Sequence, residues 1–269
     1  MDDQNLPSFE RPPVIETVLG VQFQPLPGLR NAHLGAFWKT LGEDWPVVLD
    51  APILEPIFER FTEGGSWRVT GPHLTLTSNS TSRLQIRNKT KDAMIQIQNG
   101  RLHFNWLGQK GQEYPRYKGV RPRFDDTLRR FTAFVEQLSL GDILPNQWEI
   151  TYVNHVPQGD LWRSPEDISS IFDGLPILRD SPTALRFEAF TGEWHFAIAP
   201  QQGRLHIEAG FIRSGAPAES VFRLTLTARG PANNVAEMKT GLDLGRRTIV
   251  RTFAEVASKE AKKHWGLHE

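Results

Sequence analysis

The same order of predicted elements occurs twice along the chain, and this repetition restricts the fold more than any other feature of the sequence. Each half has a strand, then a helix, then several antiparallel strands and a long helix. The tetrapeptide Gly-Arg-Leu-His at residues 100–103 returns at residues 203–206, after a turn in both cases. A short identity placed in two matching series of elements indicates an internal duplication.

A strand opens each predicted half. Residues 14–23, VIETVLGVQF, alternate with a period of two, so that Leu19, Val21 and Phe23 share one side of a strand. Pro12 and Pro13 precede this strand, where their missing N–H groups remove no sheet hydrogen bond. Residues 148–157, WEITYVNHVP, form the counterpart in the second half.

The remaining elements follow from helical and strand periodicities. In the first half we predict a helix from Asn31, a short helix at 57–61, a long helix at 123–138, and strands at 66–70, 74–78, 84–86, 95–97 and 102–106. Asn99-Gly100 predicts a hairpin turn of type I′. In the second half we predict a helix that starts at Ser164-Pro165, a last helix at 243–265, and strands at 185–190, 194–199, 204–211 and 221–228.

These elements predict an α+β protein built from two β-α-β(3–4)-α units, residues 1–142 and 143–269, in one compact unit with a pseudo-two-fold axis. Curved antiparallel sheets that grip long helices occur in TATA-box-binding-protein-like and helix-grip folds, and the predicted order is similar to both. Such a likeness concerns topology and carries no function.

Composition excludes several kinds of chemistry. The chain of 269 residues can bury a substantial core, and its 31 basic residues balance 31 acidic ones. It has no cysteine, which excludes disulfides, cysteine nucleophiles and thiolate metal sites. The first residues are acidic and lack an apolar stretch, and no apolar run reaches the ~18 residues of a membrane span. We therefore expect a cytoplasmic protein that does not enter a membrane.

Charge is distributed unevenly along the chain. Residues 1–66 have four basic and ten acidic residues, whereas residues 83–130 have twelve basic and four acidic residues. The basic stretch includes aromatic residues, so it suits a phosphate backbone with stacked bases, a protein interface, or pairing with the acidic N-terminal region. The candidate binding residues in this stretch are Tyr114, Arg116, Tyr117, Lys118, Arg121 and Arg123.

Two further candidate binding residues, Asn154 and His155, stand at the end of the second lead strand, where they would line a ligand pocket or form a satisfied pair. Glu16 places a charge within an apolar run and is expected to pair with an arginine. The histidine spacings are not those of a metal site, and the chain has no nucleophile elbow and no phosphate-binding loop. We assign no catalytic residue, no metal and no cofactor.

Three stretches, PPVIETVLGVQF, NWLGQKGQEYPRYKGVRPRF and EITYVNHV, resemble a sporadically distributed family of bacterial proteins of about this length. Members of that family begin with a strand of the form Pro-Pro-aliphatic-x-Glu, which residues 12–16 match. The family's function is uncharacterised. The resemblance implies a bacterial cytosolic protein, and it supplies no catalytic residues.

The leading hypothesis from the sequence is a non-catalytic binding protein that acts with a protein partner. One alternative is a nucleic-acid-binding protein that uses the basic surface of residues 116–130, which predicts that Arg116, Lys118, Arg121 and Arg123 face solvent together. Another is a small-ligand binder, or an enzyme, with its site between the sheet and a long helix. This alternative predicts an enclosed pocket along the apolar faces of the long helices.

Overall fold

Nine antiparallel strands form one sheet in the order β3-β4-β5-β6-β2-β7-β10-β9-β8. The computed structural model describes residues 6–59, 61, 82–109, 111–175, 187–215 and 218–268. The strands of the large sheet are β2 (Val14–Phe23), β3 (Val47–Ala51), β4 (Arg83–Arg87), β5 (Ala93–Gln98), β6 (Arg101–Leu107), β7 (Pro145–Pro157), β8 (Thr191–Ala199), β9 (Gly203–Ser214) and β10 (Glu219–Pro231). A second sheet pairs β1 (Ser8–Phe9) with β11 (Leu267–His268), which brings the two ends of the chain together.

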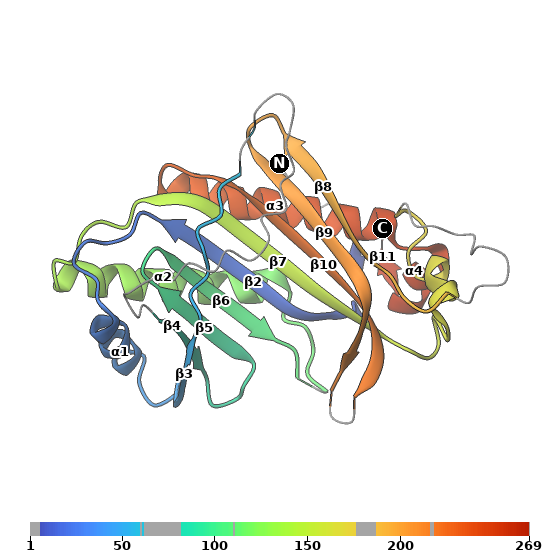
Figure 1. The fold of residues 1–269 in the computed structure, drawn as a ribbon, viewed down its shortest axis with the longest axis horizontal. Helices are drawn as coiled ribbons and strands as arrows, with labels where there is room; N and C mark the ends of the chain where they lie inside the picture. Colours follow the sequence, from blue (N-terminus) through green and yellow to red (C-terminus); the bar gives the residue numbers. More distant parts are fainter. Residues whose placement is uncertain are drawn as a thin grey trace.

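The antiparallel pair β2 and β7 joins the two halves of the chain at the middle of the sheet, with Leu19 opposite Ile150 and Val21 opposite Trp148. On each side the lead strand lies next to the last strand of its half, so that β6 neighbours β2 and β10 neighbours β7 (Figure 1). The predicted boundary at residue 142 falls between α2 (Arg116–Gln137) and β7, and the sheet continues across it. The predicted α+β class with a large antiparallel sheet is confirmed.

The two long helices, α2 and α3 (Val235–Val256), cover one face of the sheet, which we call the helix face (Figure 1). Apolar side chains fill this face, among them Phe104 on β6, Ile150 on β7 and Leu226 on β10. Their burial supplies the main stabilisation of the fold. The shorter helix α1 (Asn31–Thr40) contacts β4 and β5, and α4 (Lys259–Trp265) contacts the 3₁₀ helix η2 (Pro165–Ser170). None of the described helices is long and apolar enough to cross a membrane.

Two glycines let α3 approach the sheet closely. Trp148 is fully buried on β7, and a Cβ at Gly241 would stand 2.2 Å from its indole ring. A Cβ at Gly245 would stand 2.6 Å from the side chain of Ile150. The glycines of the sequence GLDLGRR therefore accommodate the indole, since any larger residue would push the helix away from the sheet.

The opposite face of the sheet, which we call the polar face, has buried polar side chains. Gln98, Arg101, Gln22 and Gln147 stand in one line across β5, β6, β2 and β7, because each residue is the register partner of the next. Residues 52–59, which we call the crossing segment, pass over this line, and Figure 1 shows them in front of the sheet. Among the described residues, the two faces of the sheet thus have different covers, helices on one side and an extended segment on the other.

The helix α2 begins at Arg116, seven residues before its predicted start. Gly119 and Pro122, two residue types that disfavour a helix interior, both lie inside the helix. Pro122 removes one helical hydrogen bond, and the buried side chains of Tyr117 and Val120 offset this loss by packing on the sheet.

The last predicted helix, 243–265, is two helices. The first, α3, begins at Val235, where the side chain of Asn234 accepts a hydrogen bond from the backbone of Glu237. After α3, Ala257 is extended, and the Ser258 side chain caps α4 in the same way. The capping residues Asn234 and Ser258 are the signals that the prediction overlooked. The helix predicted at Ser164-Pro165 is a 3₁₀ helix.

The region after the first helix differs most from the prediction. Residues 57–59 and 61 are not helical, because the N–H groups of Ile57 and Glu59 bond to sheet glutamines instead of helical carbonyls. The edge strand β3 was not predicted. The predicted strands 66–70 and 74–78 lie outside the described residues. In the predicted strand 185–190, residues 187–190 are not a strand, and 185–186 lie outside the described residues.

The repeated tetrapeptide does not occupy equivalent positions. Residues 101–103 belong to β6, the last strand of the first half, whereas residues 204–206 belong to β9, which precedes the last strand of the second half. The tetrapeptide therefore gives no support to a duplication. The turn at Asn99-Gly100 is present, but Gly100 has a φ of 94° and Asn99 is not among the residues with positive φ, so the turn is not of type I′.

We expect Gly241→Ala to destabilise the protein by roughly 1–3 kcal/mol, because the new Cβ would overlap the indole of Trp148. The matched control is Gly35→Ala on α1, where a Cβ would meet no atom within 4 Å. That change should leave the free energy of unfolding unchanged or raise it by up to about 1 kcal/mol, since alanine favours a helix. Denaturant unfolding measures both variants. Equal effects would contradict the close approach of α3 to Trp148.

Candidate functional site

A cavity of about 510 Å³ lies on the helix face, bounded by the sheet, the first turn of α2, the middle of α3 and strand β1. We call it the helix-face pocket. Its floor includes residues of β2, β7 and β10, so it lies over the junction of the two halves. Its apolar lining residues are Leu6, Pro7, Phe9, Pro12, Val14, Leu226, Ile249, Val250 and Phe253.

All three tyrosines of the chain, Tyr114, Tyr117 and Tyr152, line this pocket. The rings of Tyr114 and Tyr152 meet edge to face, with centroids 6.4 Å apart. The Tyr117 hydroxyl donates to Oδ1 of Asp243 at 2.6 Å and accepts from Nη1 of Arg121 at 2.5 Å. Burial raises the pKa of all three phenols, so they are neutral at pH 7.

Three basic side chains line the helix-face pocket, Arg116, Lys118 and Arg246, and none of its described lining residues is acidic. The guanidinium of Arg246 lies 5.0 Å from the ring centroid of Tyr117. The Arg116 Nη2 atom donates to the carbonyl of Phe9 at 2.6 Å, which holds β1 against α2. Arg116 keeps this position with a φ of 62°, a left-handed conformation that costs an L residue about 1 kcal/mol. The pocket therefore favours a negatively charged occupant.

Asn154, on the floor of the helix-face pocket, has a buried atom without a partner. Its side chain is 1% exposed, and Nδ2 donates to the carbonyl of Leu224 at 3.1 Å. The other atom, Oδ1, has no hydrogen-bond partner among the described residues. A buried acceptor left unpaired costs about 1–3 kcal/mol. This oxygen is buried below the pocket surface, so an N–H or O–H group of an occupant would reach it only after the Asn154 side chain rotates.

The structure brings together five of the eight binding residues that the sequence predicted. Tyr114, Arg116, Tyr117, Lys118 and Asn154 all line the helix-face pocket. They come from the residues before α2, from the start of α2 and from β7, and the packing of α2 along the sheet places them side by side.

Arg121 and Arg123, two other predicted binding residues, form ion pairs outside the pocket. Arg121 contacts Asp125 at 3.1 Å and Asp243 at 2.6 Å, and Arg123 contacts Asp92 at 3.2 Å. These carboxylates belong to α2, α3 and the turn before β5, so the predicted pairing with the acidic residues 1–66 is wrong for these two arginines. Nucleic-acid binding requires Arg116, Lys118, Arg121 and Arg123 together on one exposed surface. Arg121 and Arg123 instead form ion pairs, and Arg116 donates to the carbonyl of Phe9.

His155, the last predicted binding residue, and Glu16 also differ from expectation. His155 follows Asn154 on β7, so its side chain points to the opposite face and cannot share the pocket. Glu16 accepts a hydrogen bond from Nδ2 of Asn105 at 2.5 Å, not from an arginine. Burial raises the pKa of Glu16, and the charge of Arg87 opposes that rise.

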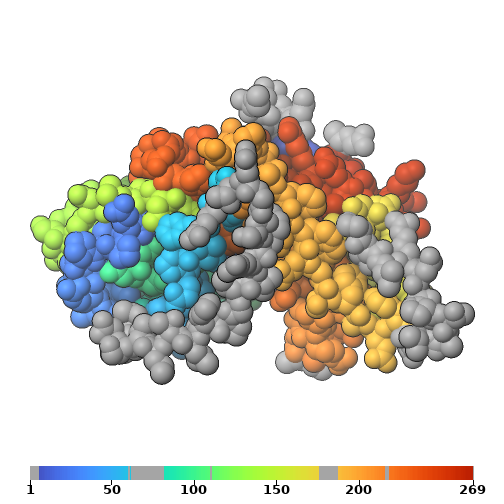
Figure 2. Space-filling view, turned by 45° about the horizontal axis from the view of Figure 1, so that its top comes forward, coloured from blue at the N-terminus to red at the C-terminus, as the bar shows by residue number. Residues whose placement is uncertain are grey.

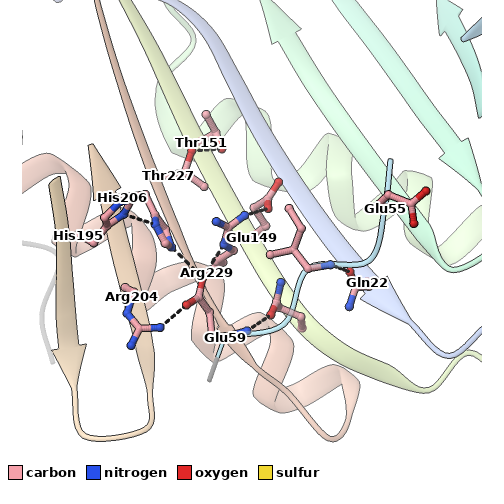
Figure 3. Close-up of polar contacts among 12 residues, drawn as sticks. Gln22, Glu55, Glu59, Glu149, Thr151, His195, Arg204, His206, Thr227 and Arg229 are labelled. Atoms are coloured by element: carbon pink, nitrogen blue, oxygen red, sulfur yellow. Dashed lines mark hydrogen bonds and ion pairs between the residues drawn. The ribbon is translucent and has the colours of Figure 1, made fainter. Parts of the chain in front are cut away.

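A second polar site, not predicted from the sequence, lies on the polar face. Glu59, at the end of the crossing segment, contacts Nη1 of Arg204 at 2.5 Å, Nε of Arg229 at 2.6 Å and Nε2 of His206 at 2.7 Å (Figure 3). The Glu59 side chain is 5% exposed. We call these four residues the Glu59 cluster. His195 extends it, with its Nδ1 atom 2.7 Å from Nδ1 of His206.

Glu149 links the Glu59 cluster to the first half of the sheet. Arg229 Nη1 lies 3.4 Å from one Glu149 oxygen, and Nε2 of His103 lies 3.7 Å from the other. Gly20 stands between His103 and Glu149 in the register, and a Cβ there would lie 2.5 Å from the imidazole. Gly20 therefore gives the His103 ring room to cross β2 toward Glu149.

Burial and hydrogen bonding in this region strongly shift the pKa values of Glu59 and His103. Burial alone would raise the pKa of Glu59, but hydrogen bonds from His206, Arg229 and Arg204 outweigh burial and lower it from 4.5 to about 2. Burial lowers the pKa of His103 from 6.5 to about 4, so its imidazole is neutral at pH 7. Glu59 therefore holds the crossing segment to Arg204 and Arg229 by its negative charge, whereas the imidazole of His103 lies uncharged beside Glu149.

A sequence signal for the polar face exists in the strands but not in the crossing segment. Polar residues recur at every second position in AMIQIQ, RLHFNWL and PNQWEITYVNHVP. Such alternation normally indicates a face exposed to water. Nothing in the irregular residues 52–59 predicts that they cover this face, so the Glu59 cluster could not be foreseen.

Comparisons with protein-family models, with curated proteins and with solved structures find no match to this chain. Among the described residues, no group of three or more histidine, aspartate or glutamate side chains could hold a metal ion. The site is therefore defined by its own geometry.

We expect Glu59→Gln to destabilise the protein by about 3 kcal/mol at pH 7, the equivalent of the pKa shift of Glu59. The pKa is depressed in the folded state, so this stabilisation is complete above pH 4.5 and is lost as the pH falls toward about 2. The difference in unfolding free energy between wild type and variant should narrow over that window.

Glu55→Gln is the matched control, because Glu55 belongs to the same segment and is exposed. It should change the unfolding free energy by less than about 0.5 kcal/mol at every pH. Urea unfolding from pH 2 to 7 measures all three proteins. A gap between wild type and Glu59→Gln that does not vary with pH would contradict the charged role of Glu59.

Proposed function

We propose that this chain is a small-molecule-binding protein that takes an apolar anion in the helix-face pocket. The observation that carries the proposal is the unpaired Oδ1 of Asn154, buried in a pocket lined by three cations and no described acidic residue. An occupant with a carboxylate or phosphate group and an apolar body would match the positive charge and the apolar lining of this pocket.

The dimensions and lining of the pocket support this class of ligand. A volume of about 510 Å³ is within the usual range of ~300–1,000 Å³ for small-molecule sites. Phe253 and Ile249 of α3 supply an apolar wall, and the tyrosines supply flat rings with polar tips. Arg246 and Lys118 supply charges for an anionic group.

The same lining favours binding over catalysis. None of the described residues that line the pocket is a histidine or a carboxylate, the side chains that act most often as general acids and bases. The tyrosines have raised pKa values, which suits neutral hydrogen bonding and opposes a nucleophilic role. Of the functions that the sequence left open, a small-ligand binder is the one this geometry supports best.

We also propose that the sheet is a duplicated unit of the kind seen in TATA-box-binding-protein-like and helix-grip folds. The strand order supports this proposal, because β6-β5-β4 beside β2 repeats as β10-β9-β8 beside β7. Each half then places its long helix on the same face. The pocket would lie near the axis that relates the two halves, where β2 and β7 meet.

The predicted protein partner and the predicted nucleic-acid surface stay predictions. Arg116 faces the pocket and Arg121 and Arg123 are ion-paired, which leaves Lys118 as the exposed member of that group. This distribution supports the pocket more than a shared phosphate-binding surface.

Two dyes with the same ring systems test the proposed function. One is 8-anilinonaphthalene-1-sulfonate, an apolar anion, and the other is N-phenyl-1-naphthylamine, which lacks the sulfonate. Arg246→Gln should weaken binding of the anion about tenfold, since a charge-assisted hydrogen bond contributes about 1.5–3 kcal/mol. The same change should affect the neutral dye less than threefold. Fluorescence titration measures all affinities.

Arg247→Gln is the control, because residue 247 is the neighbour of Arg246 on α3 and does not line the pocket. It should leave both affinities unchanged. Equal binding of the two dyes to wild type, or equal losses in the two arginine variants, would show that the pocket does not select an anion and would refute the proposal.

A further inference from the structure

The crossing segment is held to the sheet by polar contacts and not by burial of apolar side chains. Its exposed residues include Ile57 and Phe58, which are 40% and 55% exposed. The backbone of residues 52–59 makes no recorded hydrogen bond to another backbone group among the described residues. The segment therefore depends on the side chains of the polar face for its position (Figures 1 and 3).

Those side chains bind the segment's backbone at residues 54, 55, 57 and 59. Gln98 both accepts from the N–H and donates to the carbonyl of Leu54, at 2.8 Å each. Further contacts are made by Arg101 to the carbonyl of residue 55, by Gln22 to the N–H of residue 57 and by Gln147 to the N–H of residue 59. These four side chains form the line across β5, β6, β2 and β7, and they reach backbone atoms that every peptide has.

One side chain adds specificity to this backbone binding. The carboxylate of Glu59 enters the cluster of Arg204, His206 and Arg229, which supplies three donors within 2.7 Å. Two arginines and a histidine around one buried carboxylate form a site for an anion. In this chain the anion is the carboxylate of Glu59 itself.

A polar face can lose its cover more easily than an apolar one. If the crossing segment moved away, water would solvate the exposed glutamines, arginines and histidines, whereas an uncovered apolar face would have no such compensation. The segment lies on the surface, where Figure 2 shows its light-blue atoms between the strands of the two halves. Another segment could therefore replace the crossing segment on the polar face.

We propose that the polar face is a binding site for an extended acidic peptide segment of a partner protein, and that residues 52–59 occupy it as an internal competitor. The partner's segment would lie along the line of Gln98, Arg101, Gln22 and Gln147. A carboxylate of the partner would take the place of Glu59 between Arg204 and Arg229. Release of the crossing segment is then the step that admits the partner.

The test uses a fluorescent peptide with the sequence of residues 52–59, PILEPIFE, blocked at both ends. Its target is the full chain with Glu59→Lys, where a cation would face Arg204, Arg229 and His206 and expel the end of the crossing segment. The peptide should bind this variant at least tenfold more tightly than wild type. Binding should weaken as salt is raised, because the anchor is an ion pair.

Two matched changes locate the contact. A peptide whose last residue is Gln should bind the Glu59→Lys chain at least tenfold more weakly, and so should the original peptide when Arg229→Gln is added to that chain. Failure to bind the folded Glu59→Lys chain, equal binding to wild type, or equal binding of the two peptides would overturn the proposal. Circular dichroism establishes that the variant is folded.

A measurement on wild type covers the case in which Glu59→Lys does not fold. Hydrogen exchange of the N–H groups of Leu54, Ile57 and Glu59 is followed while the peptide is added in excess. Their exchange should be unchanged when the Gln-ended peptide is added. It should become faster when PILEPIFE is added, because that peptide displaces the bound crossing segment. No change with either peptide would overturn the proposal. A dimer in light scattering, with the same amides protected, would show instead that a second copy of the chain is the occupant.

Discussion

Strand β2 pairs with β7 from Val14 to Phe23, and the rest of the structure depends on the register of this pair. Because side chains alternate along a strand, the register sends Tyr152 and Asn154 to the helix face and Gln147 and Glu149 to the polar face. A slip of one residue would exchange the two faces. The apolar partners Leu19–Ile150 and Val21–Trp148 resist such a slip, since it would turn the fully buried side chains of the slipped strand to the other face.

The two faces of the sheet differ in how they are covered, and this difference separates the two proposed sites. The helices α2 and α3 are fixed by apolar burial and by the insertion of Trp148 beside Gly241, so close packing holds the walls that they give the helix-face pocket. The crossing segment is fixed by side-chain hydrogen bonds and one carboxylate, which water or another peptide can replace. A preformed pocket suits a small molecule, and an exchangeable cover suits a macromolecular partner.

The elements with strong periodicity could be predicted from the sequence, and those set by long-range contacts could not. The alternation of residues 14–23 and 148–157 identified both central strands, and the aromatic-basic stretch around residue 117 identified four residues of the pocket. The start of α2 was placed too late because Pro122 lies inside a helix that packing stabilises. Glu59 was out of reach, because its role comes from Arg204 and Arg229, which are far away in the sequence. Asn154 and His155 were paired in the prediction and are separated by the pleat.

The central claim is that the helix-face pocket binds an apolar anion, and the tyrosines offer the most direct measurement of it. All three tyrosines of the chain line the pocket, so a protein labelled with ¹³C only in tyrosine rings reports on this pocket alone. Titration with 8-anilinonaphthalene-1-sulfonate should shift all three ring signals together and to saturation, because the dye's rings would lie within the pocket. Saturable binding of the dye that leaves the three signals unmoved would contradict the account.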